Sequence, residues 1–447
     1  MRGLLLVIVG ATLLWVVISK LNHVDAGHSP NGEVAEEEAG QFMSRPGEVA
    51  DEPPASEDLE PKVVEPVVAA VDQEPEMAPI AEQEPDLPPI AFDSEWSSEQ
   101  ELALAAGLLH APSEIAKWIQ VNGRGLSEGR RRLVLALAAC IAGDRGRARS
   151  YADGLSDARD VLSEERALLE GALEPRDTRI RPASVNRESY VVHAASMALL
   201  ANGAREQLQN GKSRVAAQAF SKLILEELSA PWAADSATLS VWSSDLHRAQ
   251  EGWRWNKNAD WPSIEMVVQP GDHLTRIRKR AIEANPGLLI CTGLIERANG
   301  IRGRFIHPDD VLKIPTERAH TLVDLSARWL LYMMGDEVVG AWQVGIGKAG
   351  HETHLGEFTA GEKETEPMWF RPGKDPVPFG DAKNPLGTRW IAWLTPAGKK
   401  SSLGFHGTNE PSSMGGAVSE GCIRMLNNEV EVLFEILPRD SSILVRP

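Results

Sequence analysis

Cysteine is scarce in this sequence: 447 residues include only three, Cys140, Cys291 and Cys422. Three thiols so far apart in the chain exclude a disulfide framework and a cysteine-rich zinc site. No histidine and carboxylate pattern has the spacing of metal ligands, so we expect neither a metal ion nor another cofactor. A basic patch is also lacking, which argues against nucleic acid as a partner.

Negative charge is concentrated in one segment of the chain. The formal net charge is −18, and residues 31–93 hold eighteen acidic side chains against two basic ones, Arg45 and Lys62. The same segment contains ten prolines. Such a composition buries too little apolar surface to offset the loss of chain entropy. Residues 27–93 are therefore predicted to be a disordered acidic, proline-rich linker.

An apolar run occupies residues 4–18, between Arg2 and Lys20. Its fifteen residues fit the hydrophobic region of a secretory signal and are short for a membrane span, which needs about 20 residues. We expect residues 1–26 to be either a cleaved signal peptide or a retained membrane anchor. Either one places the bulk of the chain in the cell envelope, anchored to the membrane or secreted to the periplasm.

Residues 94–256 are predicted to form an all-α domain. A capping box that begins at Ser98 and ends at Glu101 opens the first helix, and Gly or Pro residues separate the short apolar segments that follow. Short helices in this arrangement indicate stacked hairpins or a helical-repeat array. Cys140 lies in an Ala-rich helix and is interpreted as a small core residue. The sequence does not indicate a function for this domain.

A small α+β module is predicted at residues 264–316. A short strand, a Pro-Gly turn and a helix with its N-cap at Asp272 are followed by a second short helix and a closing strand at residues 311–315. With QPGDHL near its start and VLKIP at its end, this segment resembles a LysM domain over about fifty residues. The resemblance implies binding to glycan strands that contain N-acetylglucosamine, such as those of peptidoglycan.

The C-terminal part, residues 319–447, alternates apolar and polar residues with a period of two. This pattern predicts a mostly β domain with a single helix at residues 427–437. The segments expected to be strands are residues 321–325, 329–334, 338–346, 356–360, 388–394 and 442–445.

Residues 404–426 contain one histidine, His406, and one cysteine, Cys422, within a Gly- and Ser-rich stretch. A cysteine nucleophile needs a base to remove its proton and backbone donors to hold an oxyanion. The motifs NPLGT at 384–388, FHGTNEP at 405–411 and SxGCIRM at 419–425 closely resemble the L,D-transpeptidase catalytic domain, also called the YkuD domain. The resemblance runs from Thr321 to Arg446.

This resemblance implies acyl transfer between peptidoglycan stem peptides. Cys422 would attack the carbonyl before a terminal D-amino acid and form a thioester, with His406 as the base that activates the thiol. Gly421 would leave room for backbone N–H groups at the oxyanion, and Arg424 would orient a substrate carboxylate or order the loop. Two further positions match the motif as supporting residues, Ser419 and Gly407.

One departure from the family motif concerns the residue before Gly421. The family usually has histidine there, and this chain has Glu420. A carboxylate near the thiol disfavours the thiolate, or it stabilises a protonated His406 if it reaches that ring. We interpret Glu420 as a modulator of the Cys–His pair, with a solvent-facing side chain as the alternative. His351 and His354 are interpreted as residues of a surface loop.

Three functions remain open from the sequence. The first is a transpeptidase that forms cross-links between stem peptides. The second is an L,D-carboxypeptidase of the same fold, in which water takes the acyl group. The third is a peptidoglycan-binding scaffold protein whose catalytic domain is weak because of Glu420.

Overall fold

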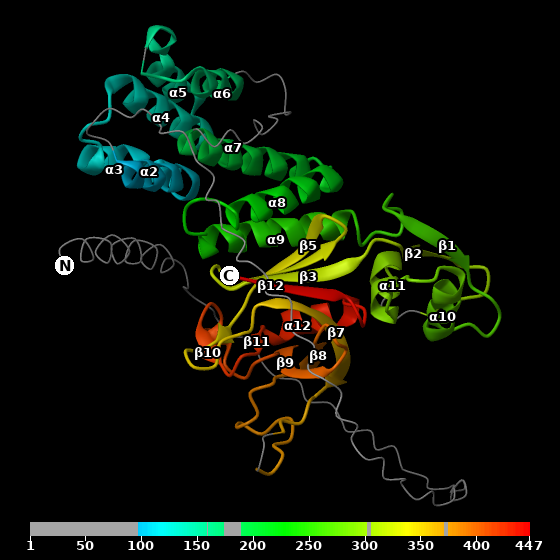
Figure 1. Cartoon of the computed structure of the whole chain (residues 1–447). Helices are drawn as coiled ribbons and strands as arrows, with labels where there is room; N and C mark the ends of the chain where they lie inside the picture. The colour runs from blue at the N-terminus through cyan, green and yellow to red at the C-terminus, as the bar shows by residue number, and fades with distance from the viewer. Residues whose placement is uncertain (1–96, 159, 174–188, 302–304, 371–373) are drawn as a thin grey trace, which may run out of the picture. The chain divides into compact units, whose positions relative to one another are not determined.

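The computed structural model describes residues 97–447, apart from 159, 174–188, 302–304 and 371–373. All described residues belong to one compact unit, whose elements are labelled in Figure 1. The predicted signal or anchor segment and the predicted acidic linker lie outside the described residues. Within the described ranges, no helix combines the length and the apolar character that crossing a membrane requires.

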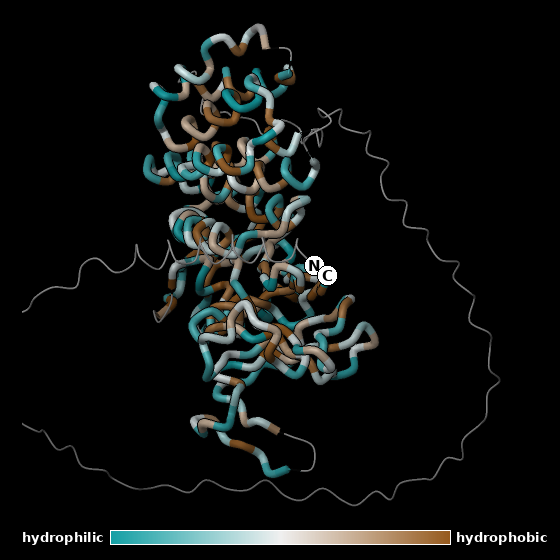
Figure 2. The backbone as a smooth tube through the Cα atoms, turned by 90° about the vertical axis from the view of Figure 1, so that its left-hand side faces the viewer, coloured by the Kyte–Doolittle hydropathy of each residue, from teal (hydrophilic) through white to brown (hydrophobic). Residues whose placement is uncertain are grey.

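The region between the predicted linker and the predicted small module is helical, as expected. Neighbouring helices pack on one another, α2 on α7, α7 on α8 and α8 on α9, and apolar residues line their inner sides (Figure 2). Alanines such as Ala194, Ala195 and Ala201 are buried in α7 and allow close approach of its neighbours. The helices are α2 (Ser98–His110), η1 (Pro112–Glu114), α3 (Ile115–Asn122), α4 (Glu128–Ile141), α5 (Arg145–Ala152), η2 (Leu155–Asp157), α6 (Ser163–Leu173), α7 (Tyr190–Gln209), α8 (Ser213–Glu227) and α9 (Ser236–Gly252).

The capping box of α2 lies one residue earlier than predicted. Ser97 is the N-cap: its Oγ accepts from the Gln100 N–H at 3.2 Å, and Gln100 Oε1 accepts from the Ser97 N–H at 3.0 Å. Glu101 is buried and pairs with Arg130 at 2.8 Å. The prediction of Ser98 and Glu101 was wrong because the Glu101 carboxylate is used inside the helical core, where Arg130 compensates its charge.

Residues 263–315 confirm the predicted order of strand, helix, helix and strand. The elements are β1 (Ser263–Val267), α10 (Leu274–Ala284), α11 (Thr292–Asn299) and β2 (Val311–Pro315), with β1 antiparallel to β2. The N-cap of α10 is His273, so the prediction of Asp272 was wrong. Asp272 Oδ2 accepts from the Gln269 N–H at 2.9 Å and pairs with Arg280 at 2.9 Å, so its carboxylate serves the preceding turn.

The C-terminal part is built on an eight-stranded sheet in the order β11-β9-β8-β7-β12-β3-β4-β5. β12 lies between β7, to which it is antiparallel, and β3, to which it is parallel. Beyond β5 the Gly345 N–H donates to the Arg424 carbonyl at 3.0 Å and the reverse bond is 2.8 Å, so the two edges of the sheet meet. The strands of this sheet are β3 (Ala319–Asp324), β4 (Trp329–Met334), β5 (Glu337–Gln343), β7 (Gly356–Thr365), β8 (Arg389–Leu394), β9 (Lys400–His406), β11 (Ile423–Arg424) and β12 (Ser442–Arg446).

Three smaller elements complete this part. β6 (Ile346–Gly347) pairs in parallel with β10 (Ala417–Ser419), and η3 (Pro411–Ser413) precedes β10. The helix α12 (Asn427–Ile436) packs against β8 and β9. The mostly β prediction with one helix near residues 427–437 is confirmed. The predicted strand over residues 338–346 is divided between β5 and β6, and β9, β10 and β11 were not predicted.

Helices α8 and α9 cover the outer edge of β5. The Val338 N–H donates to Ser221 Oγ of α8 at 2.8 Å. On α9, Ser243 Oγ donates to the Ala341 carbonyl at 2.6 Å, and His247 Nε2 accepts from the Ala341 N–H at 3.3 Å. An open edge strand is a template for pairing with other chains. Here side chains of the helical region form hydrogen bonds with the backbone groups of Val338 and Ala341 on that edge.

Arg254 joins the helical region to the sheet. Its guanidinium is 2.5 Å from Glu317, 2.6 Å from Glu337 and lies over the Trp253 ring at 4.8 Å from the centroid. The residue is only 1% exposed. A buried guanidinium needs such compensation because its desolvation is costly.

The C-terminal end of α12 is held by side chains from two other parts of the chain. The Cys291 thiol, just before α11, donates to the Glu435 carbonyl at 3.0 Å, and the Tyr332 hydroxyl donates to the Ile436 carbonyl at 3.0 Å. A Cβ on Gly293 would lie 2.5 Å from the Glu435 oxygen, so only glycine permits this approach. Burial raises the pKa of the Cys291 thiol, which keeps its proton available for donation.

Candidate active site

His406 and Cys422 are brought together by the parallel pairing of β9 with β11. Phe405 lies opposite Ile423 and His406 opposite Arg424. Because side chains alternate along a strand, the fully buried Phe405 and Ile423 face the core while His406 and Arg424 share the other face. Cys422 directly precedes β11, and its sulfur lies against the backbone of β9, the strand that ends at His406. The fifteen residues between His406 and Cys422 therefore form a loop whose two ends meet where β9 and β11 pair.

An indole forms one wall beside the histidine. Trp390 of β8 pairs with His406, and their rings are nearly parallel with centroids 6.0 Å apart. A Cβ on Gly404 would lie 2.6 Å from the Trp390 ring, so the indole occupies the space that a side chain at position 404 would need. The backbone N–H of Gly404 also faces the Cys422 sulfur. Trp390 was not singled out from the sequence.

The turn that presents Cys422 is fixed by two hydroxyl groups. Ser419 Oγ accepts from the Gly421 N–H at 3.1 Å and donates to the Cys422 carbonyl at 2.6 Å. Thr353 Oγ1 donates to the Gly421 carbonyl at 2.8 Å and accepts from the Gly347 N–H at 3.0 Å. Gly421 has a φ of 113°, which side chains disfavour. The Gly421 N–H donates to Ser419 Oγ, so the main role of Gly421 is to permit the backbone conformation of this turn.

The His406 ring is buried and its tautomer is set by a backbone carbonyl. His406 Nδ1 lies 2.6 Å from the Gly407 oxygen. A carbonyl only accepts, so Nδ1 carries the proton and Nε2 has a free lone pair. Burial lowers the pKa of His406 to about 4, the Gly407 carbonyl raises it in part, and the Arg424 charge lowers it. The imidazole is therefore neutral at neutral pH and able to accept a proton.

The Cys422 thiol is partly exposed and protonated in the resting site. Its sulfur lies 3.6 Å from the Ser402 carbonyl oxygen. Burial raises its pKa to about 11, while the Gly404 N–H and Arg424 lower it and Glu420 raises it. In the resting site the Cys422 thiol is therefore protonated and the His406 ring is neutral.

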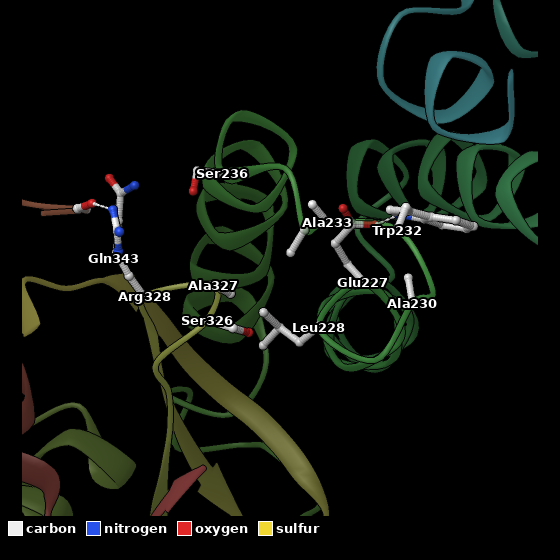
Figure 3. Close-up of a pocket in the computed structure, with 12 residues that line it drawn as sticks. Glu227, Leu228, Ala230, Trp232, Ala233, Ser236, Ser326, Ala327, Arg328 and Gln343 are labelled. Atoms are coloured by element: carbon white, nitrogen blue, oxygen red, sulfur yellow. Dashed lines mark hydrogen bonds between the residues drawn. The ribbon is translucent and has the colours of Figure 1, made fainter. Parts of the chain in front are cut away.

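Two arginines hold the loop between His406 and Cys422. Arg424 pairs with Glu410 of this loop at 3.5 Å, and its side chain is 13% exposed. From the other side, Arg328 Nη1 donates to the Gly415 carbonyl (Figure 3). Arg328 lines a cavity of about 400 Å³, together with residues around Trp232 at the end of α8. This cavity does not include the Cys422 and His406 side chains.

The Glu420 side chain faces solvent. It is 71% exposed, and its carboxylate is 4.0 Å from Lys348 Nζ. His351 and His354 are exposed residues of the neighbouring loop, as expected. Within the described residues, no group of three or more His, Cys, Asp or Glu side chains is arranged to hold a metal ion.

Alkylation of Cys422 should depend steeply on pH. With a thiol pKa of about 11, on the order of 10⁻⁴ of Cys422 is thiolate at pH 7. The rate of reaction with iodoacetamide, followed by mass spectrometry of the Cys422 peptide, should rise about tenfold per pH unit between pH 6 and 9. A plateau below pH 8 would instead show a preformed ion pair with His406.

The chain is similar to known proteins over this part of its length. The family described as the L,D-transpeptidase catalytic domain matches residues 318–445. "Putative L,D-transpeptidase YqjB" of Bacillus subtilis is 35% identical over 126 residues, which are 28% of this chain and 70% of that protein. "Putative L,D-transpeptidase YkuD" of Bacillus licheniformis is 33% identical over 190 residues, 40% of this chain and 97% of that protein.

Among solved structures, the NMR structure of the catalytic domain of an E. faecium L,D-transpeptidase is 20% identical and covers 29% of this chain and 98% of that one, with a TM-score of 0.24. From the sequence matches, this chain belongs to the L,D-transpeptidase family, and it is an enzyme of that class.

Proposed function

We propose that this protein is a peptidoglycan L,D-transpeptidase that transfers the acyl group of one stem peptide to the amine of another through a thioester on Cys422. The observation that carries this proposal is the pairing of β9 with β11, which brings Cys422, the residue before β11, to the strand that ends at a neutral His406. His406 Nε2 is the free ring nitrogen there.

The reaction would proceed in two steps. In the first, His406 Nε2 takes the proton of the thiol while the Cys422 sulfur bonds to the carbonyl carbon of the residue before a terminal D-amino acid. The C–N bond then breaks, and the amine leaves with the proton from His406. In the second, an acceptor amine attacks the thioester and gives up a proton to His406. The new amide forms, the C–S bond breaks, and the thiol regains its proton.

The other motif residues would support this chemistry. Ser419 holds the turn in which Gly421 and Cys422 lie, and Gly407 orients His406 through its carbonyl. Arg424 lies near both reacting groups, since its charge lowers the pKa of His406 and of Cys422. It would order the loop through Glu410 and attract the carboxylate of the substrate.

The remaining regions would deliver the enzyme to its substrate. We propose that residues 264–316 are a LysM domain that binds glycan strands, because the strand–helix–helix–strand order supports the resemblance of the sequence. Residues 1–26 would export or anchor the chain, and residues 27–93 would tether it in the cell envelope. In this proposal, residues 94–256 form a helical domain, residues 264–316 the LysM domain and residues 319–447 the catalytic domain.

Incubation of the purified protein with tetrapeptide stems, followed by mass spectrometry, tests the proposal. Cross-linked dimer and a mass increase on the Cys422 peptide are expected. Tripeptide without dimer would identify a carboxypeptidase instead. Absence of any turnover, with binding to intact peptidoglycan retained, would identify the scaffold protein.

Glu420 is proposed to modulate the thiol. Its charge raises the pKa of Cys422, so Glu420→Gln should increase the alkylation rate of Cys422 about two- to fivefold at every pH between 6 and 9 in low salt. The increase should shrink in 0.5 M salt, because Glu420 is exposed and screened. Glu352→Gln, in the neighbouring exposed loop, is the matched control and should leave the rate unchanged. Superimposable curves for Glu420→Gln and wild type would refute the modulation.

A further inference from the structure

Asn427, the first residue of α12, binds two loops of the active site. Its Oδ1 accepts from the Thr408 N–H at 3.0 Å and from the Thr388 N–H at 3.3 Å. Its Nδ2 donates to the Thr408 carbonyl at 3.0 Å. One carboxamide thus bonds both the N–H and the C=O of Thr408 and fixes that residue's backbone in two directions.

Two glycines allow the loops to come this close. A Cβ on Gly407 would lie 2.1 Å from Asn427 Oδ1, and one on Gly387 would lie 2.2 Å from the same atom. Gly387 also has a φ of 64°, in the left-handed region that glycine accepts at no steric cost. Both glycines are needed because the Asn427 carboxamide fills the space where their side chains would be.

The carboxamide is not an ordinary helix cap. The first turn of α12 is served by Glu429, whose Oε2 accepts from the Leu426 N–H at 3.3 Å. The three hydrogen bonds of the Asn427 side chain go to residues 388 and 408, which lie outside the helix. This geometry indicates that the Asn427 side chain stabilises the two loops more than it stabilises the end of the helix.

The link to catalysis passes through one peptide unit. The Gly407 carbonyl belongs to the same peptide group as the Thr408 N–H, which donates to Asn427 Oδ1. That carbonyl also accepts from His406 Nδ1. Because a peptide group is planar, fixing its N–H fixes the direction of its carbonyl.

We propose that Asn427 is a positioning residue that aims the Gly407 carbonyl at His406 Nδ1 and so keeps Nε2 as the proton-accepting nitrogen. This inference rests on the proposed function, in which His406 is the base. Loss of the Asn427 carboxamide frees the peptide to rotate. His406 then samples the tautomer with a proton on Nε2, which cannot accept the proton of the thiol.

The test is a ¹⁵N NMR measurement of the His406 tautomer, with His406→Gln used to assign the signal. The wild type should show the Nδ1–H tautomer, Asn427→Ala a mixture of both tautomers, and Asn427→Asp, which keeps the acceptor oxygens, the wild-type signal. Asn428→Ala is the matched control at the next, exposed residue and should resemble the wild type. Thioester formation should fall about tenfold in Asn427→Ala and less than threefold in Asn427→Asp.

Gly407→Ala provides a second variant in case Asn427→Ala does not fold. Its Cβ would push against Asn427 Oδ1, so it should give the same mixture of tautomers. An unchanged Nδ1–H signal in folded Asn427→Ala or in Gly407→Ala overturns the proposal. The tautomer is read without any substrate, so failure of this inference is distinct from failure of the proposed function, which would appear as a wild type that forms no thioester.

Discussion

Cys422→Ala is expected to abolish thioester formation and to lower stem-peptide turnover at least a thousandfold. The sulfur is the atom that bonds to the substrate in the proposed reaction, and removal of a covalent nucleophile leaves only the contribution of binding and oriented donors. The measurement is the product yield by mass spectrometry, with the melting temperature as a check on folding. Cys422 is partly exposed on the surface, so the fold should tolerate alanine.

The two other cysteines provide matched controls for this prediction. Cys140 is buried in α4, and the Cys291 thiol donates to the Glu435 carbonyl. Cys140→Ala and Cys291→Ser should retain turnover within about threefold, since neither thiol is near the site and serine keeps the hydrogen-bond donor of Cys291. Turnover by Cys422→Ala above one per cent of wild type would refute the thioester mechanism.

Arg254→Ala should cause a large loss of stability, because it removes the cation that two carboxylates share. The substitution leaves the carboxylates of Glu317 and Glu337, 18% and 29% exposed, without their shared cation. Removal of one partner from a buried ion pair costs about 3–5 kcal/mol, and the partial exposure here places the expected loss near 3 kcal/mol. The free energy of unfolding in urea measures it.

A matched control and a rescue separate this effect from general damage. The Arg248 side chain is 66% exposed and lies 3.7 Å from Asp245, which Arg205 also pairs with at 2.8 Å. Because Asp245 keeps Arg205 as its partner, Arg248→Ala should change stability by less than about 0.5 kcal/mol. Adding Glu317→Gln and Glu337→Gln to Arg254→Ala should restore part of the loss, because the unpaired charges are removed. A loss below about 1 kcal/mol for Arg254→Ala would contradict the interpretation of this cluster.

Much of the fold follows from local patterns in the sequence. β4 and β2 lie at residues 329–334 and 311–315, where strands were predicted, and α12 starts at the predicted Asn427. The motifs that contain His406 and Cys422 were also recognised, in an order that matches the family. These features are encoded within a few neighbouring residues, so the sequence alone is sufficient to find them.

Features that depend on tertiary packing were missed. β9 contains Ser401, Ser402 and Gly404, which have weak strand propensity, and its place in the sheet comes from pairing with β8 and β11. The bonds of Asn427 to residues 388 and 408 join segments that are distant in the chain. An Asn two residues after the cysteine motif and at a helix start was the available signal, and it does not indicate which residues the side chain contacts.

The protonation state of the site could not be predicted either. The sequence suggested that His406 raises the fraction of thiolate, whereas burial raises the pKa of Cys422 to about 11 and lowers that of His406 to about 4. Burial depends on how Trp390, the turn at Gly421 and the neighbouring loop close around the pair. It is a property of the folded site and not of the motif.

Helix α12 connects the loop beside His406 with Cys291 and Tyr332. Its ten residues span about 15 Å. Its first residue, Asn427, accepts a hydrogen bond from Thr408 in the loop beside His406, and its last carbonyls accept hydrogen bonds from Cys291 and Tyr332. The same short helix is therefore hydrogen-bonded at one end to the loop beside His406 and at the other to the module of residues 263–315, so the two regions share one rigid support.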